Sequence, residues 1–306
     1  MPRSLRHLLL AVLPVTLAAS LLPAVYSNQL LLFNFVVFLT LAQGVNVIYG
    51  FTGYLPFGYV GFFGAGAYGF SLCVIHLHAA PPLALAAGSL AAILLGLLLT
   101  PLLRLSGAYF AIANLAASLA LYQVISNPNL TDITKGPYGI TLSGVYQPAL
   151  SYGTAVAIMT ATLALTVFLR NSNFGLSLQA IREDAVSAAM AGIDVVRART
   201  TAWLLSALIA GLIGADFAWY VSVFYPDTVF SPEFSIFAIV FALFGGVATV
   251  SGPVLGVLLL YGIYNVIGIS TPQYFQLIYG LLIMLLVLFL PNGVVSLMRK
   301  RGIDVP

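Results

Sequence analysis

Six residues of this chain could contact a polar solute within an otherwise apolar sequence. They comprise amides, a hydroxyl, an acid and a glycine at a helix break: Gln43, Asn46, Thr52, Gly53, Asn114 and Asp216. Amides and hydroxyls donate and accept hydrogen bonds, and a carboxylate can balance a positive charge. Polar side chains within membrane-spanning runs are costly and by default mark solute or ion pathways. We therefore interpret the six as candidate pathway residues.

The sequence offers no set of residues for catalysis or metal binding. His76 and His78 have no Cys, Asp or Glu beside them, which makes a poor metal site. The phosphate-binding pattern G-x-x-x-x-G-K-[ST] does not occur, so ATP is not expected to bind by that route. No nucleophile, base and orienting group can be assembled. We therefore expect that the protein is not an enzyme and that it binds no cofactor, metal or nucleic acid.

A second candidate site is the charged segment 170–199, which carries seven of the chain's 11 basic and 8 acidic side chains. Apolar residues at helical spacing predict one short helix over 177–192, with Ser177 as its N-cap and Gly192 as its end. Asp194 is expected to cap the next helix. A small-residue face would contact a partner, and neighbouring charges would fix its register. The candidate docking residues are Arg182, Glu183, Asp184, Ala188 and Gly192.

Long apolar runs must position both the candidate pathway residues and the candidate docking residues. The chain has 306 residues, 61% hydrophobic and 6% charged, against about 25% charged residues in a soluble domain. This predicts a single all-α domain, a polytopic bundle of transmembrane helices surrounded by membrane lipid. Ten runs approach the roughly 20 residues that a span needs. They are 8–25, 30–49, 57–75, 83–103, 108–126, 150–169, 201–223, 234–250, 254–270 and 274–290.

Two alternatives concern the number of spans. Residues 234–270 could form one re-entrant pair, which would give eight spans. The run 8–25 could be a signal peptide, but the next span follows at once and no clear cleavage site appears, so an uncleaved first helix is favoured.

The basic residues select one orientation. With the N-terminus in the cytoplasm, ten of the 11 fall inside and only Lys135 falls outside. Both termini are then cytoplasmic in either span count. The segment 170–199 lies inside, and the Pro- and Gly-rich loop 127–149 lies outside.

Two glycine-rich stretches, 50–69 and 244–256, interrupt the apolar pattern on the cytoplasmic half. Gly61, Gly64 and Gly66 lie in a helical run and indicate close helix packing. The residues from Thr52 to Pro56 break the helix. Broken helices at membrane depth line cavities or are buried in protein, so this break could shape a gate.

Motifs along nearly the whole chain resemble the branched-chain amino acid ABC transporter permeases of the LivM type. The matching pieces are Asn46 with GFTGYLPFGYVGFFGAGAYG (50–69), SGAYFAIANLA (106–116), TKGPYGI (134–140), FGLSLQAIREDAVSAAMAGIDVVRAR (174–199), SALIAGLIGADFAWYVSVFYPDTVFS (206–231), FGGVATVSGPVLG (244–256) and LFLPNGV (288–294). The resemblance implies a permease subunit of a binding-protein-dependent importer in a bacterial or archaeal inner membrane.

The same resemblance implies partners and a role for the charged segment. The partners would be two cytoplasmic ATP-binding subunits, a second related permease, and a periplasmic or lipid-anchored solute-binding protein. Residues 177–192 would be the coupling helix. Related permeases carry other amino acids, urea or short amides, so the solute stays open. The alternative is a stand-alone secondary transporter or channel that uses Asp216 as a proton or ion site.

Overall fold

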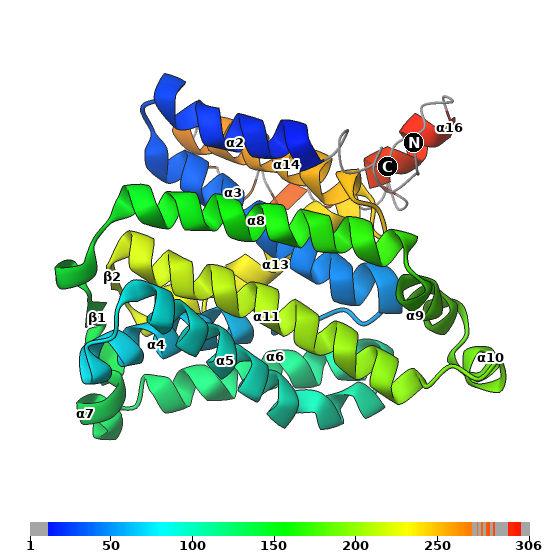
Figure 1. Ribbon diagram of the computed structural model, residues 1–306, viewed down its shortest axis with the longest axis horizontal. Helices are drawn as coiled ribbons and strands as arrows, with labels where there is room; N and C mark the ends of the chain where they lie inside the picture. Colours follow the sequence, from blue (N-terminus) through cyan, green and yellow to red (C-terminus); the bar gives the residue numbers. More distant parts are fainter. Residues whose placement is uncertain are drawn as a thin grey trace.

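The chain folds almost entirely into helices, most of which run along one common direction (Figure 1). The computed structural model describes residues 12–270 and 293–300, with five further positions between these ranges. The predicted all-α bundle is confirmed. Its principal helices are α2 Leu13–Val25, α3 Gln29–Val45, α4 Val60–Leu77, α5 Pro81–Leu99, α6 Gly107–Ile125, α8 Pro148–Asn171, α9 Asn173–Glu183, α10 Ala185–Met190, α11 Val195–Val221, α13 Pro232–Gly245, α14 Ser251–Ser270 and α16 Gly293–Lys300.

Seven helices in the described part are long and apolar enough to cross a membrane. They are Gln29–Gly50, Val60–Leu77, Pro81–Arg104, Gly107–Ile125, Pro148–Asn171, Val195–Val221 and Pro226–Gly245. Shorter apolar helices lie at Leu13–Val25 and Ser251–Ile267. Nine of the ten predicted spans thus have a helical counterpart, and the tenth, 274–290, falls largely outside the described residues. The predicted span 234–250 ends earlier, since α13 stops at Gly245 and Gly246 takes a φ of 120°.

The centre of the bundle is formed by α11, which packs against α4, α5, α3 and α8. Glycines bring α4, α5 and α11 into backbone contact. A Cβ at Gly66 would lie 2.1 Å from the carbonyl oxygen of Gly211, and one at Gly88 would lie 2.5 Å from that of Gly66. Helices in membranes associate through such small residues because these let the helix backbones approach closely. Lipid tails leave no hydrophobic driving force between the helices. The predicted packing role of Gly66 is confirmed.

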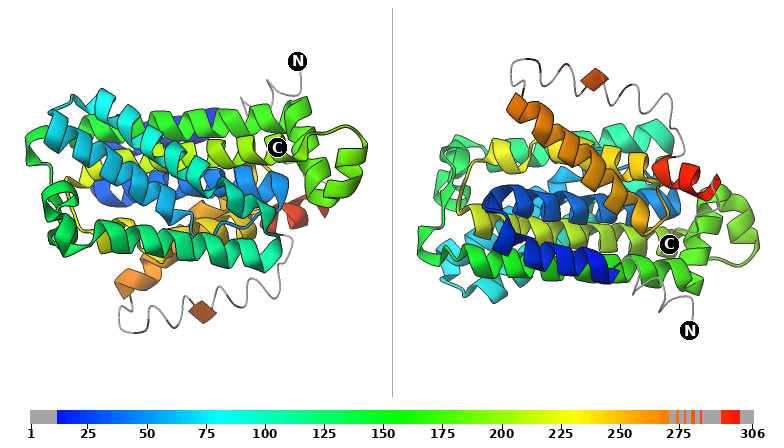
Figure 2. Two further views of the ribbon diagram at one scale, coloured as in Figure 1. Left: turned by 90° about the horizontal axis from the view of Figure 1, so that it is seen from below. Right: turned by 90° about the horizontal axis from the view of Figure 1, so that it is seen from above.

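Two interruptions divide the helical runs on one side of the bundle. The first follows α3: a π-helical turn, η2 Asn46–Gly50, leads into irregular chain before α4. The second is the turn 246–250 between α13 and α14, and α14 then crosses α3 obliquely (Figure 2, right). These are the two glycine-rich stretches that the sequence singles out.

The loops gather at opposite ends of the bundle (Figure 1). One end holds the segment between α6 and α8, whose strand β1 Ile140–Thr141 pairs antiparallel with β2 Val223–Phe224 after α11. The other end holds α9 and α10. The short elements are η3 Thr100–Arg104, η4 Pro128–Leu130, α7 Thr131–Thr134, η5 Gly136–Tyr138, η6 Ser143–Val145 and α12 Pro226–Val229. The loops predicted to lie outside and inside are therefore on opposite ends.

Candidate functional site

Asn46 joins the two interruptions. It begins η2, and its Oδ1 accepts a hydrogen bond from the backbone N–H of Ala248 at 2.7 Å. Its Nδ2 donates to the carbonyl of Thr249 at 2.8 Å. Ala248 has a φ of 60°, so the amide satisfies a turn whose own backbone cannot continue a helix. A Cβ at Gly50 would lie 2.2 Å from Asn46 Oδ1, so the close approach requires glycine there.

Gln43, about one helical turn before Asn46, contacts the same turn between α13 and α14. Its Nε2 donates to the carbonyl of Val250 at 2.7 Å, and its Oε1 accepts from Thr166 and from Asn46, each at 3.3 Å. Gln43 and Asn46 are both fully buried. The structure thus brings these two predicted pathway residues together, and in this conformation it uses them to hold the 246–250 turn.

Arg182 connects the charged segment to the first interruption. Its Nη1 donates to the carbonyl of Gly50 at 2.5 Å, across 132 positions of sequence. Its Cγ lies 3.5 Å from the position of a Cβ at Gly53, which has a φ of 80°. Thr52 donates to the carbonyl of Ile48 in its own helical run at 2.6 Å. The side chain of Arg182 therefore reaches into its own chain.

The prediction of one helix over 177–192 was wrong, because Asp184 divides the segment. The helix α9 starts earlier, with Ser172 as the N-cap that accepts from the N–H of Gly175 at 3.1 Å, and it ends at Glu183. Asp184 is extended (φ −154°, ψ 111°), and its Oδ1 accepts from the N–H of Ser187 at 2.7 Å. A side chain that caps a new helix competes with continuation of the old one.

Of the predicted end signals, Gly192 and Asp194 are confirmed, whereas Ser177 is wrong as an N-cap: it lies inside α9 and its hydroxyl donates to the carbonyl of Asn173. Gly192 has a φ of 86° and follows α10. The N–H of Ile193 donates to the carbonyl of Ala188, which closes the C-terminal turn. Asp194 caps α11 by accepting from the N–H of Arg197 at 3.0 Å.

Of the predicted docking residues at α9 and α10, Arg182 and Gly192 are exposed and Ala188 is not. Ala188 is only 4% exposed and packs toward the bundle, whereas Val186 is 71% and Met190 is 85% exposed. Glu183 and Asp184 are also exposed. The hydrogen bond from Ser187 to the Asp184 carboxylate holds its pKa below the usual value. The tip therefore presents two apolar side chains beside two acids.

Asn114 joins α6 to the start of α4. Its Oδ1 accepts from the N–H of Gly58 at 2.7 Å, and a Cβ at Gly58 would meet the Asn114 carbonyl oxygen at 2.1 Å. Its buried Nδ2 has no hydrogen-bond partner in the described part of the chain, and the same is true of Ser118 Oγ, one turn further along α6. This α4–α6 seam thus contains two unsatisfied polar groups.

Asp216 lies far from these groups in sequence, on α11 against α8. It is fully buried, and its Oδ1 accepts from the hydroxyls of Thr154 and, at 3.3 Å, Ser151. Its Oδ2 has no partner among the described residues. Ser118, Ser151, Thr154 and Thr166 also belong to these sites and were not among the residues predicted from the sequence. Ser118 follows Asn114 at the i+4 spacing of one helix face, a signal that could have found it.

Comparisons with known proteins place the chain in a family. A family model described as the branched-chain amino acid transport system / permease component matches residues 29–288. The chain belongs to this permease family. It is a transport subunit and a multi-pass inner membrane protein, and this agrees with the resemblance found in the sequence.

The matches to individual relatives differ in how much of each chain they cover. The permease is 28% identical over 301 residues to the high-affinity branched-chain amino acid transport system permease protein LivM of Salmonella typhimurium, covering 87% of this chain and 69% of LivM. It is 30% identical over 146 residues to the L-arabinose ABC transporter permease protein AraH of Azospirillum brasilense, covering 45% of this chain and 43% of AraH. LivH of Escherichia coli is 27% identical over 143 residues, 46% of each chain. No solved structure matches the permease significantly.

Proposed function

We propose that the permease is the membrane subunit of an ATP-driven, binding-protein-dependent importer of branched-chain amino acids or related small solutes. The hydrogen bond from Arg182 to Gly50 is the observation that carries the proposal. It ties the cytoplasmic segment directly to a helix break within the bundle. A stand-alone transporter would have no need for such a link.

The proposed partners follow from this assignment. Two cytoplasmic ATP-binding subunits supply the energy, and one of them contacts the α9–α10 tip through Val186 and Met190. A second related permease completes the pathway, and a solute-binding protein delivers the solute at the opposite end. Movement of α9 on ATP binding pulls on Gly50 through Arg182. Asn46 passes that movement to the 246–250 turn.

The solute pathway is proposed to follow the seam between α4 and α6. Asn114 Nδ2 and Ser118 Oγ are buried and unsatisfied in the described structure, so a solute carboxylate or carbonyl would supply the missing partner. In this proposal Gln43, Asn46, Thr52 and Gly53 form the inner gate. Asp216 is assigned to the contact between α8 and α11.

Co-purification tests the assignment to an ATP-driven importer. The tagged permease is expressed with the proposed ATP-binding subunits, and bound ATPase is measured after detergent extraction. Val186→Asp and Met190→Asp are expected to release the ATPase, because each places a charge in an apolar contact. Tyr138→Asp is the matched control, since Tyr138 is 74% exposed at the opposite end and should leave ATPase binding unchanged. Equal ATPase retention by all three variants would refute the proposed docking tip.

Uptake assays test the solute. The LivM match covers 87% of the chain and the AraH match 45%, and this favours an amino acid over a sugar. Vesicles that hold the assembled importer are expected to take up leucine only with ATP and the binding protein. Uptake of arabinose with no uptake of leucine would reject the amino-acid assignment.

Asp216→Asn tests the stand-alone alternative. The amide oxygen can accept the same hydroxyl hydrogen bonds, so an ATP-driven importer should keep its uptake within a few-fold. A transporter that binds a proton or ion at Asp216 would lose gradient-driven uptake entirely. Uptake by the purified single chain under an ion gradient, abolished by this substitution, would favour the alternative.

A further inference from the structure

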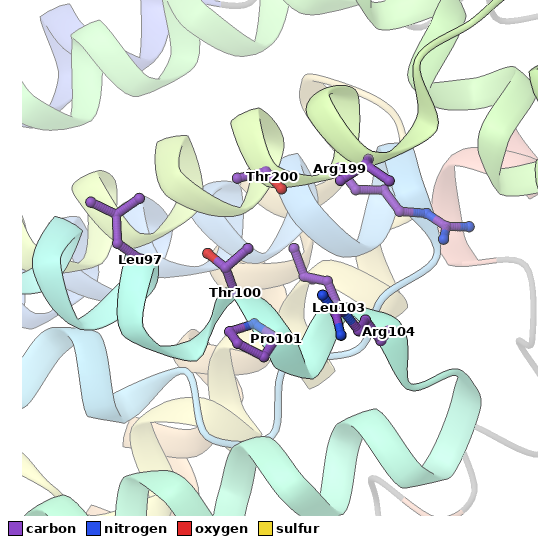
Figure 3. A pocket seen from close by; sticks show the side chains of 8 residues that line it. Leu97, Thr100, Pro101, Leu103, Arg104, Arg199 and Thr200 are labelled. Atoms are coloured by element: carbon purple, nitrogen blue, oxygen red, sulfur yellow. The ribbon is translucent and has the colours of Figure 1, made fainter.

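A groove lies between the end of α5 and the start of α11, at the end of the bundle that carries α9 and α10 (Figure 3). Its volume is about 480 Å³. None of the six predicted pathway residues lines it, so it is separate from the α4–α6 seam. The lining side chains are Leu97, Thr100, Pro101, Leu103, Arg104, Val196, Arg199 and Thr200.

The charge of this groove is entirely positive. Arg104 and Arg199 line it, and no acid does. Neither arginine forms a salt bridge within the described residues, whereas the nearby Arg197 pairs with Asp194 at 3.0 Å. The Nε of Arg199 is buried and has no hydrogen-bond partner in the same part of the chain. The groove thus holds two uncompensated cations, one of which has an unsatisfied donor.

The position of Arg199 is fixed by its surroundings. Its guanidinium carbon lies 4.8 Å from the ring centroid of Tyr54. The Tyr54 hydroxyl donates to the carbonyl of Leu103 at 3.2 Å, and its ring packs edge-on against Phe110 with centroids 4.9 Å apart. A cation held over an anchored ring is preorganised for an anion.

The groove carries its two arginines toward one end, and apolar and threonine side chains line the rest. Leu97 lies on α5 toward the middle of the bundle, Thr100 and Thr200 follow, and Arg104 and Arg199 lie nearer the loop end (Figure 3). Leu97 is 50% and Val196 is 73% exposed. The positive-inside orientation places the arginines at the cytoplasmic interface, where the leaflet supplies anionic headgroups. Basic pockets between helices on this side suit such headgroups.

We propose that this groove binds an anionic phospholipid of the cytoplasmic leaflet, with its phosphate between Arg104 and Arg199 and one acyl chain along Leu97. The phosphate oxygens accept from both guanidinium groups, which match phosphate geometry. The bound lipid bridges the α5 end and the α11 start, next to the segment that leads to α9 and α10. Phosphatidylglycerol has the required chemistry, and the zwitterionic phosphatidylcholine lacks the net charge.

Lipid titration of the full-length purified permease tests this site. Bound lipid is counted by native mass spectrometry, and thermal unfolding is followed in detergent with phosphatidylglycerol or phosphatidylcholine. Phosphatidylglycerol should bind and raise the unfolding temperature more than phosphatidylcholine. Arg104→Gln and Arg199→Gln should each weaken phosphatidylglycerol binding roughly fivefold, the effect of one basic residue near an anionic surface. Arg197→Gln is the matched control and should bind normally, because Arg197 does not line the groove.

Further experiments distinguish a bound lipid from other possible occupants of the groove. Leu97→Trp fills the apolar part without changing charge and should weaken lipid binding, so it decides the question if the arginine variants fail to fold. Inorganic phosphate should not reproduce the stabilisation, and if it does so fully the lipid assignment is overturned. Displacement of phosphatidylglycerol by added ATP-binding subunits would make the groove a protein contact and would also overturn it. Equal lipid affinity of wild type and both arginine variants has the same consequence.

Discussion

Arg182 donates a hydrogen bond to the carbonyl of Gly50, and this single contact links α9 to the broken end of α3. Gly50 in turn lies against Asn46, which holds the turn at Ala248. Three segments far apart in sequence therefore meet at one point. A displacement of α9 would either break the Arg182–Gly50 hydrogen bond or shift the first interruption with it.

Arg182→Gln should uncouple transport from ATP hydrolysis and leave the ATPase bound. Hydrogen bonds to charged groups contribute about 1.5–3 kcal/mol, so the loss of this one should lower solute uptake per ATP by roughly tenfold or more. The measurement is uptake and ATP hydrolysis in the same vesicles. Arg197→Gln is the matched control, since the Arg197 side chain is 89% exposed, pairs with the helix cap Asp194, and should couple normally. Release of the ATPase by Arg182→Gln would show that the side chain acts at the docking surface instead.

Asn46→Ala should destabilise the permease by about 1–3 kcal/mol, the cost of leaving buried backbone groups unsatisfied. The groups are the N–H of Ala248 and the carbonyl of Thr249. Chemical unfolding in detergent, or the shift of the thermal midpoint, measures the effect. Thr160→Val serves as the control, because Thr160 bonds only within its own helix to Val156 and should cost far less. An equal effect of the two substitutions would contradict the bridging role of Asn46.

Gly66→Ala should destabilise the contact between α4 and α11. The new methyl group would lie 2.1 Å from the carbonyl oxygen and 2.6 Å from the Cα of Gly211, so the helices must separate. Overpacking of this kind costs about 1–3 kcal/mol. Gly153→Ala is the matched control on α8: nothing lies within 4 Å of its Cβ position, and alanine gains helix propensity there. The thermal unfolding temperature of Gly66→Ala should be lower than that of wild type. The unfolding temperature of Gly153→Ala should equal or exceed that of wild type.

Asp184→Ala should loosen α10 without unfolding the bundle. The carboxylate caps the helix at Ser187, and this hydrogen bond lowers the pKa of Asp184. A carboxylate with a depressed pKa stabilises the folded state above its unfolded pKa, and that contribution is lost as the pH falls through the folded value. The cap should therefore persist at neutral pH and fail only in acid below its ordinary pKa of 3.8.

Hydrogen exchange of the backbone amides at 185–190 measures this cap. Exchange should accelerate in Asp184→Ala, whereas Asp184→Asn should retain most protection, since asparagine is an equally good N-cap. Unchanged exchange in the alanine variant would mean that packing of Ala188, and not the cap, holds α10 in place.

Helix positions could be predicted because the reasons for them are local. An apolar run of about 20 residues has few other solutions in a bilayer, so nine predicted spans have helical counterparts. Gly192 and Asp194 also act locally, one by tolerating a positive φ and the other by capping its own helix. Asp184 shows the limit of such reasoning. Its capping signal was present, but the apolar periodicity on both sides of it favoured one continuous helix.

The sequence by itself determined the class of protein, the family and the residues whose polarity needs an explanation. Only the tertiary structure decided what each polar side chain contacts. Gln43 meets Val250 across 207 positions and Arg182 meets Gly50 across 132, and no local pattern encodes either pair. The physical reason is that a buried polar group must find a partner wherever packing brings one within about 3 Å. Packing satisfied Gln43 and Asn46, and it left Asn114, Ser118 and Arg199 each with an unpaired polar atom in the described structure.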